Sequence, residues 1–162
     1  MVKRSFIGCL TAALVVIAVP VTQAKTTVKG RPFTATILGA TVKSTGQIPA
    51  PGSNSVQAGT LTSSLGSGAA ITTTSFAAGS SPTTFTFKGT TTFFTANGSI
   101  RSTIAGGGSV TLGASVKITI NGTGKVTGGT GRYAKATGKY KLSGSTAPNA
   151  PVNITIKGTI TP

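Results

Sequence analysis

The 162-residue sequence contains no aspartate, glutamate or histidine, and its single cysteine is Cys9. Without these residues there can be no Ser-His-Asp triad, no pair of carboxylates for glycoside hydrolysis and no carboxylate site for calcium or magnesium. One cysteine also excludes an internal disulfide and a structural thiolate metal site. We therefore expect no metal and no cofactor, and the composition argues against an enzyme.

The composition favours β-structure. The chain has 31 threonines, 16 serines and 23 glycines, whereas aromatic residues make up only 6%. β-branched threonine suits strands, and glycine and serine suit turns. The charge is of one sign, because 15 lysines and arginines give a formal net charge of +15.

The N-terminus has the pattern of a secretory signal peptide. Lys3 and Arg4 precede an apolar stretch over residues 6–19, and Thr22-Gln23-Ala24 places small residues before a cleavage point. We expect a signal-peptide helix over residues 1–24, cleavage after Ala24, and a secreted, extracellular or periplasmic protein. An uncleaved membrane anchor is the alternative, although the apolar stretch is shorter than the ~20 residues that span a bilayer.

Beyond residue 83 the hydrophobic pattern has a period of two, which predicts strands with one buried face. The apolar residues of these strands form the candidate lining of an interior: Phe85, Phe87, Ile100, Ile104, Ile118, Tyr140 and Ile156. The cations fall on the opposite, solvated face and are the candidate contacts for a polyanion: Lys88, Arg101, Lys117, Lys139, Lys141 and Lys157.

Turn signals divide the chain. Asn97-Gly98 and Asn121-Gly122 predict hairpin turns, and the glycines at 106–108 and the segment 147–151 predict looser breaks. Further strands are expected near residues 33–37 and 68–75, separated by a long flexible loop at about 44–60. Together these signals predict a single all-β domain over residues 25–162, with about eight short antiparallel strands in a sandwich or closed barrel.

The segment 124–138 reads Gly-Lys-Val-Thr-Gly-Gly-Thr-Gly-Arg-Tyr-Ala-Lys-Ala-Thr-Gly. It resembles a motif shared by plant dirigent proteins and by bacterial exported proteins with an allene-oxide-cyclase-like barrel. Residues 88–100 are similar to the hairpin that precedes this motif, and the resemblance extends over residues 83–161. It implies an eight-stranded antiparallel β-barrel with a central cavity, often assembled as a homotrimer.

The motif itself is interpreted as a structural turn in which glycines adopt backbone angles closed to other residues, the tyrosine anchors the turn and the arginine lies over the rim. Its residues are Gly128, Gly129, Gly131, Arg132, Tyr133 and Gly138. The alternative is a dinucleotide-binding G-x-G-x-x-A pattern starting at Gly129. That pattern needs a following helix and an acidic residue for the ribose, and the chain has no acidic residue.

The sequence departs from the family at the residues that matter for catalysis. Dirigent proteins and the plant cyclase use pocket carboxylates, and this chain has none to supply. A lysine with a pKa of ~10.4 is a poor base unless it is buried, and the lysines are expected to face outward. An enzyme that acts only by confining its substrate remains an alternative.

Three functions stay open. The first is an exported, non-enzymatic barrel that binds a small apolar ligand, or anionic envelope and extracellular polymers through its basic outer face. The second is a cyclase- or dirigent-like enzyme, and the third is a structural envelope or matrix protein. Specific nucleic-acid recognition is not expected, because aromatics are scarce and no recognition module is present. The basic face also has a simpler interpretation, which is that it keeps the barrel soluble.

Overall fold

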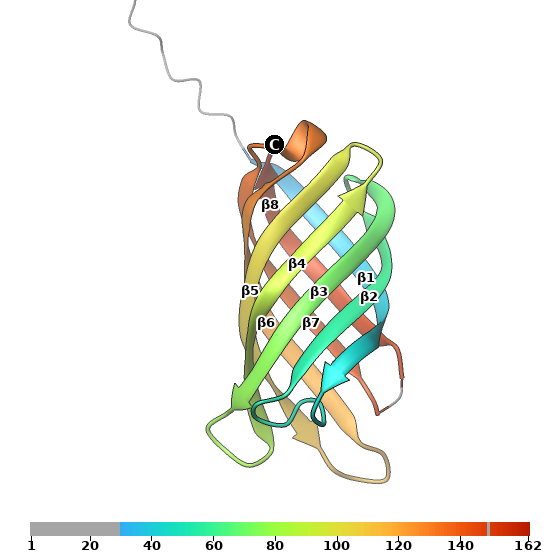
Figure 1. The fold of residues 1–162 in the computed structure, drawn as a ribbon, viewed down its shortest axis with the longest axis vertical. Coiled ribbons are helices and arrows are strands. Elements are labelled where there is room, and N and C mark those ends of the chain that lie inside the picture. Colours follow the sequence, from blue (N-terminus) through green and yellow to red (C-terminus); the bar gives the residue numbers. More distant parts are fainter. Residues whose placement is uncertain (1–29, 149) are drawn as a thin grey trace, which may run out of the picture.

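The computed structural model describes residues 30–148 and 150–162, and it is a closed eight-stranded antiparallel barrel (Figure 1). Each strand pairs with the next along the chain, and the last pairs with the first. The strands are β1 (Arg31–Thr45), β2 (Asn54–Ser63), β3 (Gly66–Ala78), β4 (Thr84–Thr95), β5 (Gly98–Thr111), β6 (Lys117–Gly129), β7 (Thr137–Thr146) and β8 (Val152–Thr161). The expected signal peptide lies outside the described residues.

The two ends of the barrel differ. A single turn of 3-10 helix, η1 (Gly131–Tyr133), joins β6 to β7 at the upper end in Figure 1, which we call the η1 end. The connections 46–53, 79–83, 112–116 and 147–151 lie at the opposite end, which we call the loop end. In the described part of the chain, no helix is long and apolar enough to cross a membrane.

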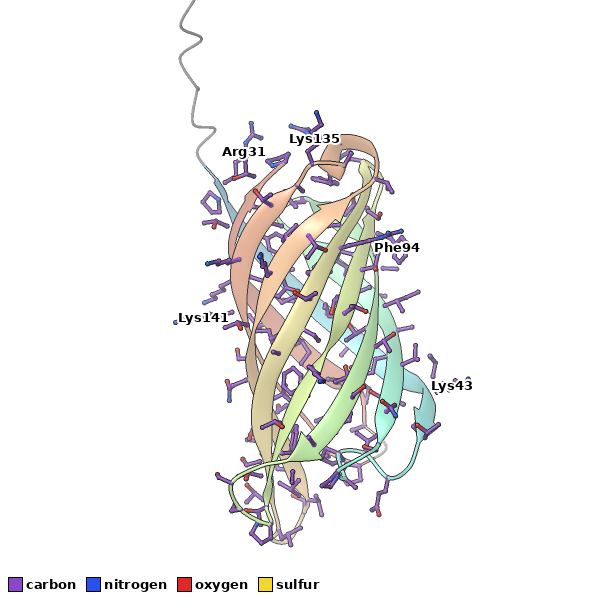
Figure 2. The ribbon with its side chains drawn as sticks, turned by 60° about the vertical axis from the view of Figure 1, so that its left-hand side comes forward. Arg31, Lys43, Phe94, Lys135 and Lys141 are labelled. Atoms are coloured by element: carbon purple, nitrogen blue, oxygen red, sulfur yellow. The ribbon has the colours of Figure 1, made fainter. Side chains whose placement is uncertain are left out.

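The strands with one buried face that the period-two pattern predicts are confirmed. In β4, Phe85 and Phe87 are buried while Thr86 and Lys88 between and after them are exposed. All eleven lysines and arginines within the described residues are exposed. The expected outward direction of Lys117, Lys139 and Lys157 is therefore correct, and Figure 2 shows Lys141 extending away from the barrel wall.

Two of the predicted breaks are wrong. Asn121-Gly122 lies inside β6, and the glycines at 106–108 lie inside β5. These glycines make room for aromatic rings, because a Cβ at Gly106 or Gly122 would approach the Phe87 ring carbon Cζ to 2.8 or 3.0 Å. Small and large inward residues thus alternate around the barrel, as in other small barrels. Asn97-Gly98 does mark a hairpin: the turn is at residues 96–97, and Gly98 opens β5 with φ +125°.

The long loop expected at 44–60 is also wrong in extent. β1 continues to Thr45 and β2 begins at Asn54, so the connection is only 46–53. Backbone hydrogen bonds from Gly52 N to Phe76 O (2.9 Å) and from Phe76 N to Ser53 O (3.0 Å) attach it to β3. The strand was missed because its inward positions include Gln57 and Gly59, which carry no hydrophobic signal.

The upper half of the interior is a packed core. Phe33, Phe93 and Tyr140 form three edge-to-face pairs with ring centroids 5.9, 6.0 and 6.2 Å apart. Tyr133 of η1, 3% exposed, joins the same core from the end of the barrel. Such pairs add about 0.5–1.5 kcal/mol each beyond the area they bury. The η1 end is closed, and any opening into the interior must lie at the loop end.

Candidate functional site

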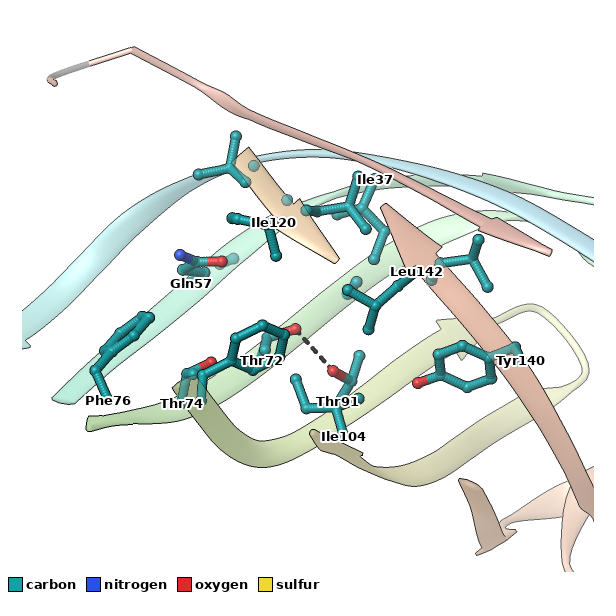
Figure 3. A pocket seen from close by; sticks show the side chains of 18 residues that line it. Ile37, Gln57, Thr72, Thr74, Phe76, Thr91, Ile104, Ile120, Tyr140 and Leu142 are labelled. Carbon is teal, nitrogen blue, oxygen red and sulfur yellow. Dashed lines mark hydrogen bonds between the residues drawn. The ribbon is translucent and has the colours of Figure 1, made fainter. Parts of the chain in front are cut away.

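Below the aromatic core, the barrel interior contains a chamber of about 70 Å³ (Figure 3). Its walls are mostly aliphatic side chains, including Ile37, Ile104 and Leu142, and the Tyr140 ring lies at its η1-end side. No lysine or arginine lines it. An engineered apolar cavity that binds benzene is about 150 Å³, so this chamber holds only part of a ligand.

The chamber continues into a wider vestibule at the loop end, of about 650 Å³. Gln57, Phe76, Ile120 and Val152 line both spaces and form the neck between them. The connections 46–53 and 147–151 contribute to the vestibule rim. Ligand sites usually measure about 300–1,000 Å³, so the vestibule is of suitable size for a small molecule.

Three of the hydroxyl groups that line the chamber, those of Thr72, Thr91 and Tyr140, have hydrogen-bond partners. The Oγ1 atoms of Thr72 and Thr91 lie 3.0 Å apart in a hydrogen bond. The Ser102 hydroxyl donates to the Thr91 carbonyl oxygen (3.2 Å) and shares a 2.6 Å hydrogen bond with the Tyr140 hydroxyl. Because these groups already have partners, the polar groups left to meet a ligand are the Thr74 hydroxyl on the chamber wall and the Gln57 amide at its neck.

Among the described residues that line the chamber, Tyr140 has a side chain whose pKa is shifted. Burial raises the pKa of its phenol from 10.0 to about 12, because the phenolate would lose its hydration. The hydroxyl is therefore protonated at neutral pH and is a weak base and a weak acid alike. This favours binding over acid–base catalysis in the chamber.

The seven residues of the predicted lining are all buried, but they divide into three groups. Phe87, Ile104, Tyr140 and Ile156 line the chamber. Phe85 and Ile118 line the vestibule, and Ile100 belongs to the packed core at the η1 end. Sequence alternation identified the inward face, but it could not tell filled from open positions.

The outer surface has a second candidate site, formed by β6, β7 and β8. Lys125 of β6 is directly opposite Lys139 of β7, and Lys141 of β7 is directly opposite Lys157 of β8. All four are exposed. Directly opposed residues of antiparallel strands have Cβ atoms about 4.5–5.5 Å apart, so each pair brings two ammonium groups together.

These four lysines surround a shallow hollow of about 710 Å³, which we call the lysine groove. Its floor includes the short residues Ala105, Thr123 and Gly158, and the buried residues Ile104, Gly124 and Tyr140 also belong to its lining. A second hollow of about 450 Å³ adjoins it and shares Lys141 and Lys157. The groove is therefore a basic channel with a small, neutral floor.

The predicted polyanion contacts are only partly brought together. Lys139, Lys141 and Lys157 line the groove, whereas Lys88, Arg101 and Lys117 do not. Lys88 is separated from Lys141 by β5 and β6 at the same level of the barrel. Lys125 was missed, although its position between inward Gly124 and Val126 is the same alternation that identified the others.

The glycine-rich motif spans the end of β6, the η1 turn and the start of β7. Gly128 and Gly131 have φ values of +127° and +57°, Gly129 ends β6 and Gly138 lies in β7. Arg132 is exposed, while the Tyr133 N–H donates to the Thr130 carbonyl at 3.0 Å. The segment has the geometry of a turn, and the single 3-10 turn offers no helix N-terminus for a pyrophosphate.

Comparison with known proteins gives no match: no family model fits the chain, and no similar protein is found among the curated proteins or the solved structures.

Proposed function

We propose that the protein is an exported, non-enzymatic barrel that binds a small apolar molecule through its loop end. The observation that carries the proposal is the continuity of the apolar chamber with the vestibule at the Gln57 neck. The expected export rests on the signal-peptide pattern of residues 1–24.

The shapes of the two spaces define the ligand. The chamber of about 70 Å³ is narrow and apolar, so it accepts the end of an aliphatic chain. The larger remainder of the molecule occupies the vestibule, where Phe76 and Phe85 offer aromatic surface. Because no described lysine or arginine lines either space, a neutral ligand is favoured over an anion.

The alternatives have less support. A cyclase- or dirigent-like enzyme would have to work by confinement, since the Thr72, Thr91 and Tyr140 hydroxyls are hydrogen-bonded and the chain has no carboxylate side chain to act as a base. A matrix protein that assembles through strand edges would need unpaired edges. Every described strand has a partner on both sides in the closed barrel.

Binding of a neutral fluorescent probe with an aliphatic tail tests the proposal. We expect saturable binding to the purified protein, and at least tenfold weaker binding to Gln57→Trp, whose indole would fill the neck. Ser145→Trp is the matched control, because Ser145 is exposed on the outer face of β7 and lines neither the chamber nor the vestibule. Absence of saturable binding, or equal binding by Gln57→Trp, would contradict the proposal.

The homotrimer implied by the family resemblance is proposed to form through the outer face of β1 to β4. Leu38, Thr60, Ala69 and Phe94 follow one another across these strands, and Leu38 and Phe94 are 53% and 43% exposed. Neither β2 nor β3 contains a lysine or arginine. A second copy thus meets least like-charge repulsion on this face. Sedimentation of the native protein should show a trimer. The trimer should be lost when a lysine replaces Ile71, an exposed residue of β3.

A further inference from the structure

We propose that the lysine groove binds a phosphate polymer without bases, of the glycerol-phosphate or sugar-phosphate type. This site is on the outside of the barrel and is independent of the apolar ligand proposed for its interior. The polymer would lie along the groove floor, with successive phosphates beside Lys125, Lys139, Lys141 and Lys157.

The like-charge pairs are the first step of the argument. Like charges directly opposite one another destabilise a sheet, and the barrel has two such pairs on adjacent strands, Lys125 with Lys139 and Lys141 with Lys157. No side chain of the protein can neutralise them, because the sequence has no aspartate or glutamate. The opposite charge must therefore come from anions outside the protein, and a polyanion held in the groove would supply several charges at once.

The distribution of charge is the second step. If the cations served only for solubility, they would do so best when dispersed over the surface. Instead, four of the eleven described cations surround one groove, while β2 and β3 contain none. Clustering the cations at one place increases the repulsion between them, and it is useful when a polyanion is held there.

The spacing of the lysines fits a polymer with one negative charge per repeat unit. Neighbouring strands are about 4.8 Å apart, and residues two apart in a strand, such as Lys139 and Lys141, are separated by about 6.8 Å. Both distances are shorter than the Debye length of about 10 Å at 0.1 M salt, so the fields of the four ammonium groups add. The small residues of the floor allow the polymer backbone to approach closely.

The residue types favour phosphate over carboxylate. All four cations are lysines, which act as point charges with three rotatable donors and suit the several oxygens of a phosphate. Recognition of planar carboxylates typically uses the fork of an arginine, and none lines the groove.

The groove also has no surface for stacking bases. Proteins that hold single-stranded nucleic acid use exposed aromatic rings, whereas Tyr140, the aromatic residue of the groove lining, is only 3% exposed and turns its ring inward. Phe94, an exposed aromatic residue, lies on β4 outside the groove. A polymer of phosphates without bases therefore fits better than DNA or RNA.

The test measures binding of delipidated poly(glycerol phosphate) as salt is raised. We expect log affinity to fall against log salt with a slope near −3, which is about −0.7 for each of four phosphates. A variant with glutamine in place of Lys125, Lys139, Lys141 and Lys157 should bind the polymer at least 100-fold more weakly at 0.1 M salt. Its log affinity should also change much less with log salt. Circular dichroism confirms that the variant is folded.

A variant of equal net charge provides the control. Replacing Lys43, Lys88, Lys117 and Lys135, which lie outside the groove, with glutamine should lower affinity less than threefold. Equal losses in the two variants would show that only total charge matters, and would overturn the proposal. Equal or tighter binding of polygalacturonate, or of oligothymidylate with the same number of charges, would overturn the choice of a base-free phosphate polymer.

Discussion

Ser53 and Ser55 show how much the environment of a single hydroxyl matters in this barrel. Both are buried, with 3% and 1% exposure, and they are two residues apart at the start of β2. The Ser53 Oγ donates a 2.6 Å hydrogen bond to the Ala50 carbonyl, whereas the Ser55 Oγ has no partner among the described residues. A buried hydroxyl without a partner destabilises the fold by about 1–3 kcal/mol.

These two serines give opposite predictions for the same substitution. Ser55→Ala should raise the free energy of unfolding by about 1 kcal/mol, because an unpaired polar group is removed. Ser53→Ala should lower it by about 1 kcal/mol, because the hydrogen bond that closes the 46–53 connection is lost. Urea unfolding of both variants measures the effects, and equal effects would show that Ser55 is hydrogen-bonded in solution.

Tyr140 predicts a loss of stability in strong alkali. Its pKa is about 12 in the folded barrel and about 10 in an unfolded chain. The contribution of the neutral phenol is fully present below pH 10 and is lost as the pH rises from about 10 to about 12, because the unfolded chain releases its proton first. Two pKa units correspond to about 2–3 kcal/mol.

The difference between the native protein and Tyr140→Phe isolates this contribution, since the other alkaline groups are common to both. The free energy of unfolding of the native protein should decline more steeply than that of the variant between about pH 10 and pH 12. Ultraviolet titration of the native protein should show one tyrosine ionising near pH 12. If no tyrosine ionises near pH 12, the Tyr140 phenol is in contact with water.

At the scale of strands, alternation was a sufficient guide to which residues face inward. It identified the buried face of β4 to β8 and all of the outward lysines of these strands except Lys125 from sequence alone. It missed most of β2, because an amide and a glycine occupy inward positions there, and it took the glycines of β5 and β6 for turns. A glycine that makes space for a ring and a glycine that allows a turn cannot be told apart in the sequence.

The groove shows the same limit. Each lysine could be placed on the outer face from the sequence, but their proximity depends on the register between β6, β7 and β8. Register in a barrel is fixed by packing of the inward side chains around the whole circumference. The continuity of chamber and vestibule likewise depends on how four different strands bring together Gln57, Phe76, Ile120 and Val152.

The contact between β6 and β7 gives a prediction at this scale. Gly124 is opposite Tyr140, and a Cβ at position 124 would overlap the tyrosine ring. Gly124→Ala should therefore lower the free energy of unfolding by about 1–3 kcal/mol, as overpacking does in other cores. The loss should shrink by at least about 1 kcal/mol when Tyr140→Leu is also present, because the two residues are in contact.

Gly113→Ala is the control for this cycle. Its Cβ would have open space, with the nearest atom the Ser115 carbonyl oxygen at 4.0 Å, and its φ is not in the left-handed region. That substitution should leave stability unchanged or raise it slightly, because it restricts the unfolded chain. Strictly additive effects of Gly124→Ala and Tyr140→Leu would show that the glycine is not needed for the ring.

At the scale of the whole molecule, the absence of carboxylates determines the response to acid. Acid unfolding of most proteins comes from carboxylates that are paired in the native state and must be protonated at low pH. This chain has no aspartate, glutamate or histidine to protonate. Its side-chain charge is therefore the same at pH 7 and pH 3 in the folded and unfolded states alike.

We expect the free energy of unfolding, measured with urea at constant ionic strength, to agree within about 0.5 kcal/mol between pH 7 and pH 3. Lys141→Glu supplies the contrast, because it places a carboxylate opposite Lys157. Such an exposed pair contributes about 0.2–1 kcal/mol, present above pH 4 and lost as the pH falls and the carboxylate is protonated. Acid sensitivity in the variant alone would show that the native barrel resists acid because it has no acidic side chain to titrate, whereas acid unfolding of the native protein would contradict this explanation.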